Sequence, residues 1–152
     1  DVTDEIRSKE VTKIVSLVSS IVEVRLAMVE VQRNLAKGKD VIMEGRDITT
    51  YVFPKADVKI YLDAAEEERA KRRYNEMQEK KIEMTYEEVL KNIQQRDKND
   101  KEKEIGALKI AEDAIYIDTT NLSIEEVKDK VEEIIRKIRK GNNVNSLYGI
   151  NR

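Results

Sequence analysis

The chain has 152 residues, a length that fits one domain, and its 29 basic and 31 acidic side chains give a formal net charge of −2 at pH 7. This balance offers no electrostatic reason to expect a nucleic acid or an anionic membrane as partner. Cysteine and histidine are both absent, which excludes disulfides, thiolate nucleophiles, imidazole metal ligands and histidine bases.

Two helices are predicted at the start of the chain. Apolar residues recur at helical spacing in two groups, Val11, Ile14, Val15 and Val18, and then Val24, Met28 and Leu35. Residues 19–22 hold crowded β-branched side chains, which favour a break between the helices. We expect the second helix to stop at Gly38, which follows Lys37 in the pattern typical of a helix C-terminus.

Three short apolar runs, at residues 41–43, 58–62 and 114–117, are predicted to be strands, and the last two are followed by Asp63 and Asp118. Helical stretches between them indicate a parallel α/β sheet. Three strands are few for such a sheet, because its centre is buried on both faces and sheets average about five or six strands. We therefore expect the fold to be incomplete on its N-terminal side.

Three later helices are each predicted to begin with a capping box, in which a cap oxygen accepts a backbone N–H and a glutamate reaches back. The pairs are Asp63 with Glu66, Thr85 with Glu88, and Ser123 with Glu126. The tail at residues 141–152 is rich in Asn and Gly and is expected to be loose.

The sharpest local signal is the run Glu44-Gly-Arg46-Asp47-Ile-Thr-Thr50, directly after the first predicted strand. Ligands of open α/β sheets bind beyond the carboxyl ends of strands, where Gly allows close backbone approach and Arg with Asp supplies a donor and an acceptor. A strand-to-helix turn with a surface ion pair explains the same spacing.

A second signal is a basic cluster, Arg69, Lys71, Arg72 and Arg73, followed by a charged run from Arg96 to Lys103. Arginines that converge from two helices can bind phosphate oxygens and stabilise a phosphoryl group in transfer. Solvated helix charges paired at i,i+4 spacing are the plainer interpretation, and charge alone leaves both open.

Taken together, four segments in this order resemble bacterial cytidylate kinases: EGRDITTYVFP, VKIYLDAAEEERAKRR, EEVLKNIQQRDKNDKEKEIGALK and AEDAIYIDTTNLSIEEV. The opening DVTDEIRSKEVTKIVSLVSSIVEVR resembles the part of that family before the Gly-Arg-Asp motif. The resemblance covers residues 1 to about 138. It implies a P-loop NTPase-like nucleoside monophosphate kinase fold, a parallel sheet with helices, that transfers phosphate from ATP with Mg²⁺ to CMP or dCMP.

The resemblance also implies roles for particular residues. Arg46 would hold the CMP phosphate, Asp47 and Asp100 the sugar, and Ser16 and Arg25 the cytosine. The catalytic residues would be Arg72 and Arg96, which stabilise charge on the transferred phosphate. Arg73 beside them would bind the ATP cofactor, Lys103 stands where many members carry a substrate-binding Arg, and Asn99 replaces another frequent Arg. No metal-ligating residue is assigned.

The same resemblance divides the chain. Residues 1–37 would be the helical part that joins the substrate insert to the core, residues 38–81 and 107–140 the kinase core, and residues 82–106 a lid that closes over ATP. None of the five glycines begins the motif G-x-x-x-x-G-K-[ST], whose backbone cradles phosphates. We therefore expect a fold that lacks its first strand and P-loop, and no kinase turnover by this polypeptide alone.

Other functions stay open on the sequence. The chain could be a non-catalytic CMP-binding remnant, a different nucleoside monophosphate kinase, or a helical interaction module. We expect a cytoplasmic protein with no membrane or nucleic-acid partner, because no apolar run reaches the length of a membrane span. The intact enzyme is expected to be a monomer, while exposed sheet edges could make this chain self-associate.

Overall fold

The structure, a computed structural model, describes residues 1–3, 5–7 and 9–141, with the side chains at positions 7, 9, 10, 12, 13 and 16 outside that description. Positions 142–152 of the predicted loose tail therefore lie outside the described residues. The elements in chain order are η1 (Glu5–Arg7), α1 (Lys9–Val18), α2 (Val22–Ala36), η2 (Ile48–Val52), β1 (Ile60–Asp63), α3 (Glu66–Glu79), α4 (Tyr86–Glu102), β2 (Ile115–Asp118) and α5 (Ile124–Arg139).

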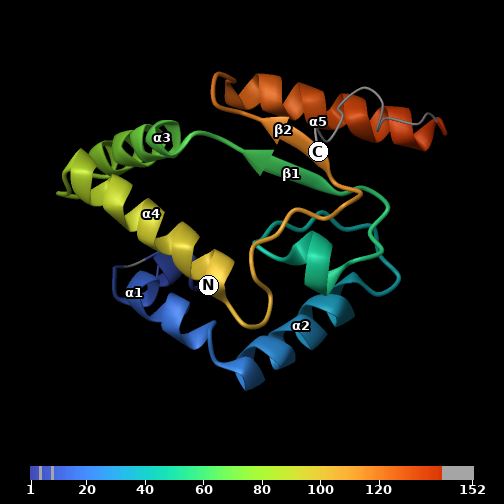
Figure 1. Cartoon of the computed structure of the whole chain (residues 1–152), viewed down its shortest axis with the longest axis horizontal. Helices are drawn as coiled ribbons and strands as arrows, with labels where there is room; N and C mark the ends of the chain where they lie inside the picture. Colours follow the sequence, from blue (N-terminus) through green and yellow to red (C-terminus); the bar gives the residue numbers. More distant parts are fainter. Residues whose placement is uncertain (4, 8, 142–152) are drawn as a thin grey trace.

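The sheet joins two segments that lie far apart in the sequence. Within the described residues it consists of β1 and β2, which pair in parallel with Ile60 opposite Ile115. Helix α5 runs along this sheet (Figure 1) and places Ile134 against Ile115 and Ile117 in a buried apolar cluster. The two later strand predictions and the parallel pairing are thus confirmed, although β1 begins two residues and ends one residue later than predicted, and β2 lies one residue later.

The predicted strand at residues 41–43 is wrong. The structure has no strand there, and the side chain of Ile42 is 97% exposed. A strand is defined by hydrogen bonds to a neighbour, and none of the described segments pairs with this run. The two-stranded parallel sheet is consistent with an incomplete α/β fold, because parallel sheets are ordinarily larger and covered on both faces.

A second apolar cluster lies apart from the sheet. Val29 of α2 packs against Ile48 and Val52 of η2, and all three side chains are buried. In η2 the amide of Phe53 bonds back to Ile48 O and that of Val52 to Asp47 O, the five-residue spacing of a π-helical turn. This turn follows Asp47 directly and anchors the Gly-Arg-Asp segment on α2.

The early helices break and stop where the sequence predicts. Helix α1 ends at Val18 and α2 begins at Val22, which confirms the predicted break and places it at residues 19–21. Helix α2 ends at Ala36, and Gly38 adopts a φ of +66° in open space, a conformation that favours glycine. In the described part of the chain, no helix combines the length and the apolar character needed to cross a membrane.

Two of the three predicted capping boxes form. The hydroxyls of Thr85 and Ser123 each accept a hydrogen bond from the third backbone N–H of their helix, α4 and α5. The carboxylates of Glu88 and Glu126 in turn accept the backbone N–H of Thr85 and Ser123. The box at Asp63 was wrong: Ala65 caps α3, and Asp63 accepts bonds from its neighbour Ala64 N and from Tyr116 Oη. That bond from the hydroxyl to Asp63 raises the pKa of Tyr116 to about 12.

Helices α3 and α4 form a hairpin beside the end of β1 that leads into α3 (Figure 1). Its turn holds Lys81 at a φ of +54°, and its helices meet where Tyr74 packs edge-on against Tyr86 at a centroid distance of 6.2 Å. The hairpin places a row of charged α4 side chains opposite the Gly-Arg-Asp segment.

A buried lysine fixes the other end of the sheet. Lys59 is 7% exposed and donates from Nζ to Pro54 O at 2.6 Å and to both carboxylate oxygens of Asp113 at 2.6 and 2.8 Å. The bond from Lys59 holds the pKa of Asp113 below its usual range. The pair therefore ties the segment before β1 to the segment before β2.

This pair predicts a pH-dependent effect of Asp113→Asn. A carboxylate whose pKa is lowered by folding contributes stability above its unfolded pKa of about 3.9, and this is lost as the pH falls through the folded pKa. We expect the variant to be less stable by up to about 1 kcal/mol at pH 7, since Asp113 is largely exposed. Urea unfolding at several pH values measures the difference, and a gap that stays constant below pH 4 contradicts the prediction.

Candidate functional site

The side chain of Arg46 extends from the loop before η2 to two carboxylates of α4. Its Nε lies 3.2 Å from Asp100 Oδ2, and its Nη1 lies 3.8 Å from Asp97 Oδ1. The Arg46 side chain remains 37% exposed, so its guanidinium is held from one side and open on another. Ion pairs therefore join the Gly-Arg-Asp segment to α4.

Asp100 is the most connected carboxylate of this group. Its side chain is 7% exposed and faces three cations: Arg46, Lys103, whose Nζ is 2.8 Å from Oδ1, and Arg96, whose Nε is 3.8 Å from Oδ2. None of the described residues gives Asp100 Oδ2 a contact with hydrogen-bond geometry. A buried carboxylate oxygen without such a donor is available to a ligand hydroxyl.

Asp47 pairs with Arg25 of α2 and is 5% exposed. The chain closes over this pair at Gly106, whose φ is +71° and whose missing Cβ would touch the Asp47 carboxylate and Arg25 Nε. Glycine is needed here for both reasons, because another residue would be strained and would displace the carboxylate. The end of the predicted lid thus lies against Asp47.

The structure adds two residues that the sequence-based assignment left out. Arg69 of α3 donates from Nε to Ala64 O at 3.0 Å, and its Nη1 lies 2.7 Å from Asp97 Oδ2. Asp97 is 8% exposed. The signals for both were present, since Arg69 belongs to the basic cluster and Asp97 precedes Asp100 by three residues, but only the helix pairing brings them together.

Arg46, Arg69 and Asp97 border a hollow of about 440 Å³ beside the carboxyl ends of β1 and β2, whereas Asp47, Asp100 and Arg96 are not among the residues that line it. The hollow is also lined by Lys101, by the carboxylates of Asp63, Glu66 and Asp118, and by Tyr61 and Tyr116. Desolvation raises the pKa of Tyr61, so its hydroxyl stays protonated at neutral pH. Cations, carboxylates and hydroxyls in one hollow suit a phosphorylated polyhydroxy ligand.

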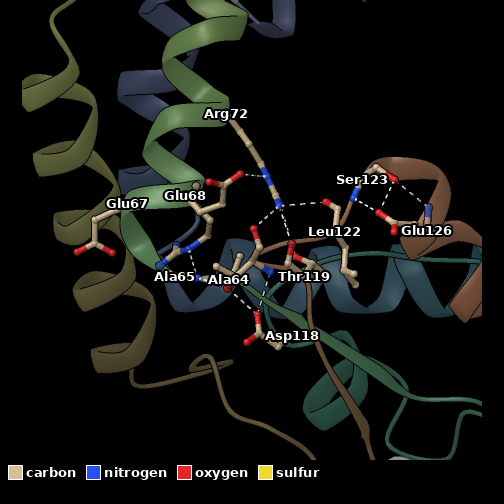
Figure 2. A network of polar contacts seen from close by, with 12 residues as sticks. Ala64, Ala65, Glu67, Glu68, Arg72, Asp118, Thr119, Leu122, Ser123 and Glu126 are labelled. Atoms are coloured by element: carbon tan, nitrogen blue, oxygen red, sulfur yellow. Dashed lines mark hydrogen bonds and ion pairs between the residues drawn. The ribbon is translucent and has the colours of Figure 1, made fainter.

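Arg72 is placed differently from Arg46 and Arg96. Figure 2 shows it reaching from α3 to the loop after β2, where Nη2 donates to Thr119 O at 2.6 Å and, more weakly, to Leu122 O at 3.4 Å. Its Nε bonds Glu68 at 3.1 Å. Among the described residues no ion pair joins Arg72 to Asp97 or Asp100. The structure therefore does not bring it to the charged cluster, which is formed by Arg46, Arg69, Arg96, Asp97, Asp100 and Lys103.

Two further residues of the sequence-based assignment, Arg73 and Ser16, have no described contact with the charged cluster. Arg73 is exposed and pairs with Glu76 one turn along α3, at 2.6 Å. Ser16 lies in α1, but its side chain is outside the part of the chain that the structure describes. The described residues contain no group of three or more potential metal ligands.

The contacts of Arg72 predict a structural cost for Arg72→Ala. The change removes a charged donor from the carbonyl of Thr119, and we expect the ligand-free chain to lose about 1–2 kcal/mol of unfolding free energy. Urea unfolding measures this loss, with Lys71→Ala as the control on an exposed neighbouring position. Equal stability of the two variants would show that the loop does not depend on Arg72.

Comparisons with known proteins show which family this chain is similar to. The family model "Cytidylate kinase" matches residues 1–140. The chain is similar to the cytidylate kinases of Caldicellulosiruptor saccharolyticus (54% identical over 138 residues, 91% of this chain and 61% of that protein) and Fusobacterium nucleatum (50% over 139 residues, 91% and 64%). That of a Geobacillus species is 54% identical over 137 residues, 90% of this chain and 61% of the relative.

The chain thus spans about three-fifths of the length of the curated relatives that it matches. The match nevertheless includes every element of the described fold and each residue of the charged cluster. The chain belongs to the cytidylate kinase family, whose members are nucleoside monophosphate kinases.

Proposed function

We propose that this chain supplies the CMP-binding and lid parts of a cytidylate kinase, which transfers a phosphoryl group from ATP to CMP or dCMP. The observation that supports the proposal best is the convergence of Arg46, Arg96 and Asp100. A guanidinium and a buried carboxylate side by side match the phosphate and the hydroxyls of a nucleoside monophosphate. The assignment of cytosine as the base of the nucleotide rests on family membership.

In this proposal Arg46 binds the CMP phosphate. Its planar fork can bind two phosphate oxygens at once, and the partial burial of the site strengthens the attraction. Asp100 and Asp47 accept bonds from the sugar hydroxyls, while Arg25 and Ser16 contact the base. Lys103 supports Asp100 with a compact charge, since an ammonium lacks the planar fork of arginine.

The proposed catalytic groups are Arg96 and Arg72, with Arg73 on the ATP side. Arg96 is exposed on α4, where closure of residues 82–106 can bring it to the transferred phosphate. Arg72 would first release some of its contacts with the loop after β2. Such arginines act by position and charge, which is the main requirement of phosphoryl transfer. ATP and Mg²⁺ as cofactors, a monomeric state and a cytoplasmic location belong to the same proposal.

A second candidate is CMP binding without catalysis. The 152 residues contain no G-x-x-x-x-G-K-[ST] motif, so a cradle for the ATP phosphates is absent from this sequence. A kinase for a different nucleoside monophosphate would share the fold and the charged cluster, and titration with UMP and AMP beside CMP separates that case.

The first prediction of the proposal concerns binding. We expect calorimetry to show saturable binding of CMP to the chain, and Arg46→Ala to weaken it by about tenfold or more, because a charge-assisted contact to phosphate is lost. Arg136→Ala is the control, since Arg136 lies exposed on α5 and pairs with Glu132 away from the hollow. Equal affinity of the two variants would remove Arg46 from the site.

The second prediction concerns turnover. We expect the 152-residue chain to show no CMP-dependent release of ADP in a coupled assay, even where calorimetry detects bound CMP. The physical reason is that nothing in the sequence replaces the backbone cradle and lysine of a P-loop. Robust CMP-dependent ATP consumption by the purified chain would contradict this expectation and favour a complete active site.

A further inference from the structure

Asp97 is the one carboxylate of the cluster to which the proposed function gives no role. It lies three residues before Asp100 on α4, so both point from the same side of the helix. Its Oδ2 is 2.7 Å from Arg69 Nη1 and its Oδ1 is 3.8 Å from Arg46 Nη1. One buried carboxylate therefore stands between two guanidinium groups that come from different elements.

The two arginines are fixed by different second anchors. Arg69 is held at Nε by Ala64 O, directly after β1, and Arg46 is held at Nε by Asp100. Arg69 is thus oriented by a hydrogen bond and an ion pair, and Arg46 by ion pairs to two carboxylates. The positive charges of Arg46 and Arg69 repel each other, and the Asp97 carboxylate between them offsets that repulsion.

Both guanidinium groups border the same hollow of about 440 Å³. The Arg46 side chain is 37% exposed and that of Arg69 is 30% exposed, whereas the Asp97 side chain is only 11% exposed. The arginines are therefore accessible to a ligand and the carboxylate behind them is largely covered. Two guanidinium groups are thus accessible in a hollow whose lining also carries the carboxylates of Asp63, Glu66 and Asp118.

We propose that Asp97 is a positioning residue that aligns Arg46 and Arg69 for one anionic group, and that Arg69 is a second phosphate-binding arginine of the site. The ligand class is a phosphomonoester, which two converging guanidinium groups can bind through several oxygens. The inference rests on the proposed function, because it takes the nucleotide phosphate as that group.

The direction in which Asp97→Asn changes the affinity for phosphate distinguishes a positioning role from a purely electrostatic one. If Asp97 only added a negative charge near the phosphate, Asp97→Asn would strengthen phosphate binding, since it removes a repulsion. If Asp97 aligns the arginines, the same change weakens phosphate binding, because both guanidinium groups lose the partner that fixes them. The two interpretations thus predict opposite changes in the affinity for phosphate.

The test compares CMP with cytidine, which lacks the phosphate, by calorimetry on the 152-residue chain. The ratio of the two affinities measures the contribution of the phosphate. We expect Asp97→Asn to lower this ratio by about tenfold while cytidine affinity stays within twofold of wild type. A ratio that is unchanged or raised overturns the role of Asp97. Glu102→Gln, an exposed charge change on the same helix, is the control and should leave the ratio unchanged.

Arg69→Lys gives an independent measurement should Asp97→Asn fail to fold. It keeps the positive charge but cannot contact Ala64 O and Asp97 together, so we expect a loss in the ratio of about tenfold as well. An unchanged ratio removes Arg69 from the phosphate site. If wild type binds neither CMP nor cytidine, the proposed function itself fails, whereas normal wild-type binding with unchanged variants overturns this inference alone.

Discussion

The carboxylates of α4 and the guanidinium of Arg46 form the interaction on which the candidate site depends. The described apolar packing is divided, with one cluster between α5 and the sheet and another between α2 and η2. Neither cluster includes α4. The helix is connected to the Gly-Arg-Asp segment through the ion pairs that Asp97 and Asp100 form with Arg46. A polar contact therefore determines where the site lies.

This arrangement has a consequence for ligand binding. The cations that could hold a phosphate are already paired with aspartates, so an anion must share or replace those partners. Paired arginines avoid the cost of leaving like charges unopposed in a partly buried place. They also keep their orientation before a ligand arrives, which reduces the entropy lost on binding. The aspartates therefore lower the affinity for phosphate by competing for the arginines, and in return they hold the arginines in place before the ligand binds.

The sheet explains why the structure is consistent with only part of an α/β fold. One face of the β1–β2 pair packs on α5, and the other carries the stacked rings of Tyr61 and Tyr116, with centroids 6.0 Å apart. Apolar side chains elsewhere are exposed, including Ile42 and several on α1 and α2. Parallel sheets are normally covered on both faces, and the matched relatives are longer than this chain.

The sequence by itself determined the local features: the break between α1 and α2 and the caps at Thr85 and Ser123. These depend on neighbours a few residues away. It could not determine that residues 41–43 stay unpaired or that Asp63 bonds Tyr116, because both depend on distant partners. The charged run that begins at Arg96 could likewise be identified from the sequence. Only the tertiary structure decided that Arg69 pairs with Asp97 while Arg72 bonds Thr119 O. Arg69 and Arg72 lie three positions apart on α3 and nevertheless reach different partners, Asp97 of α4 and the loop after β2.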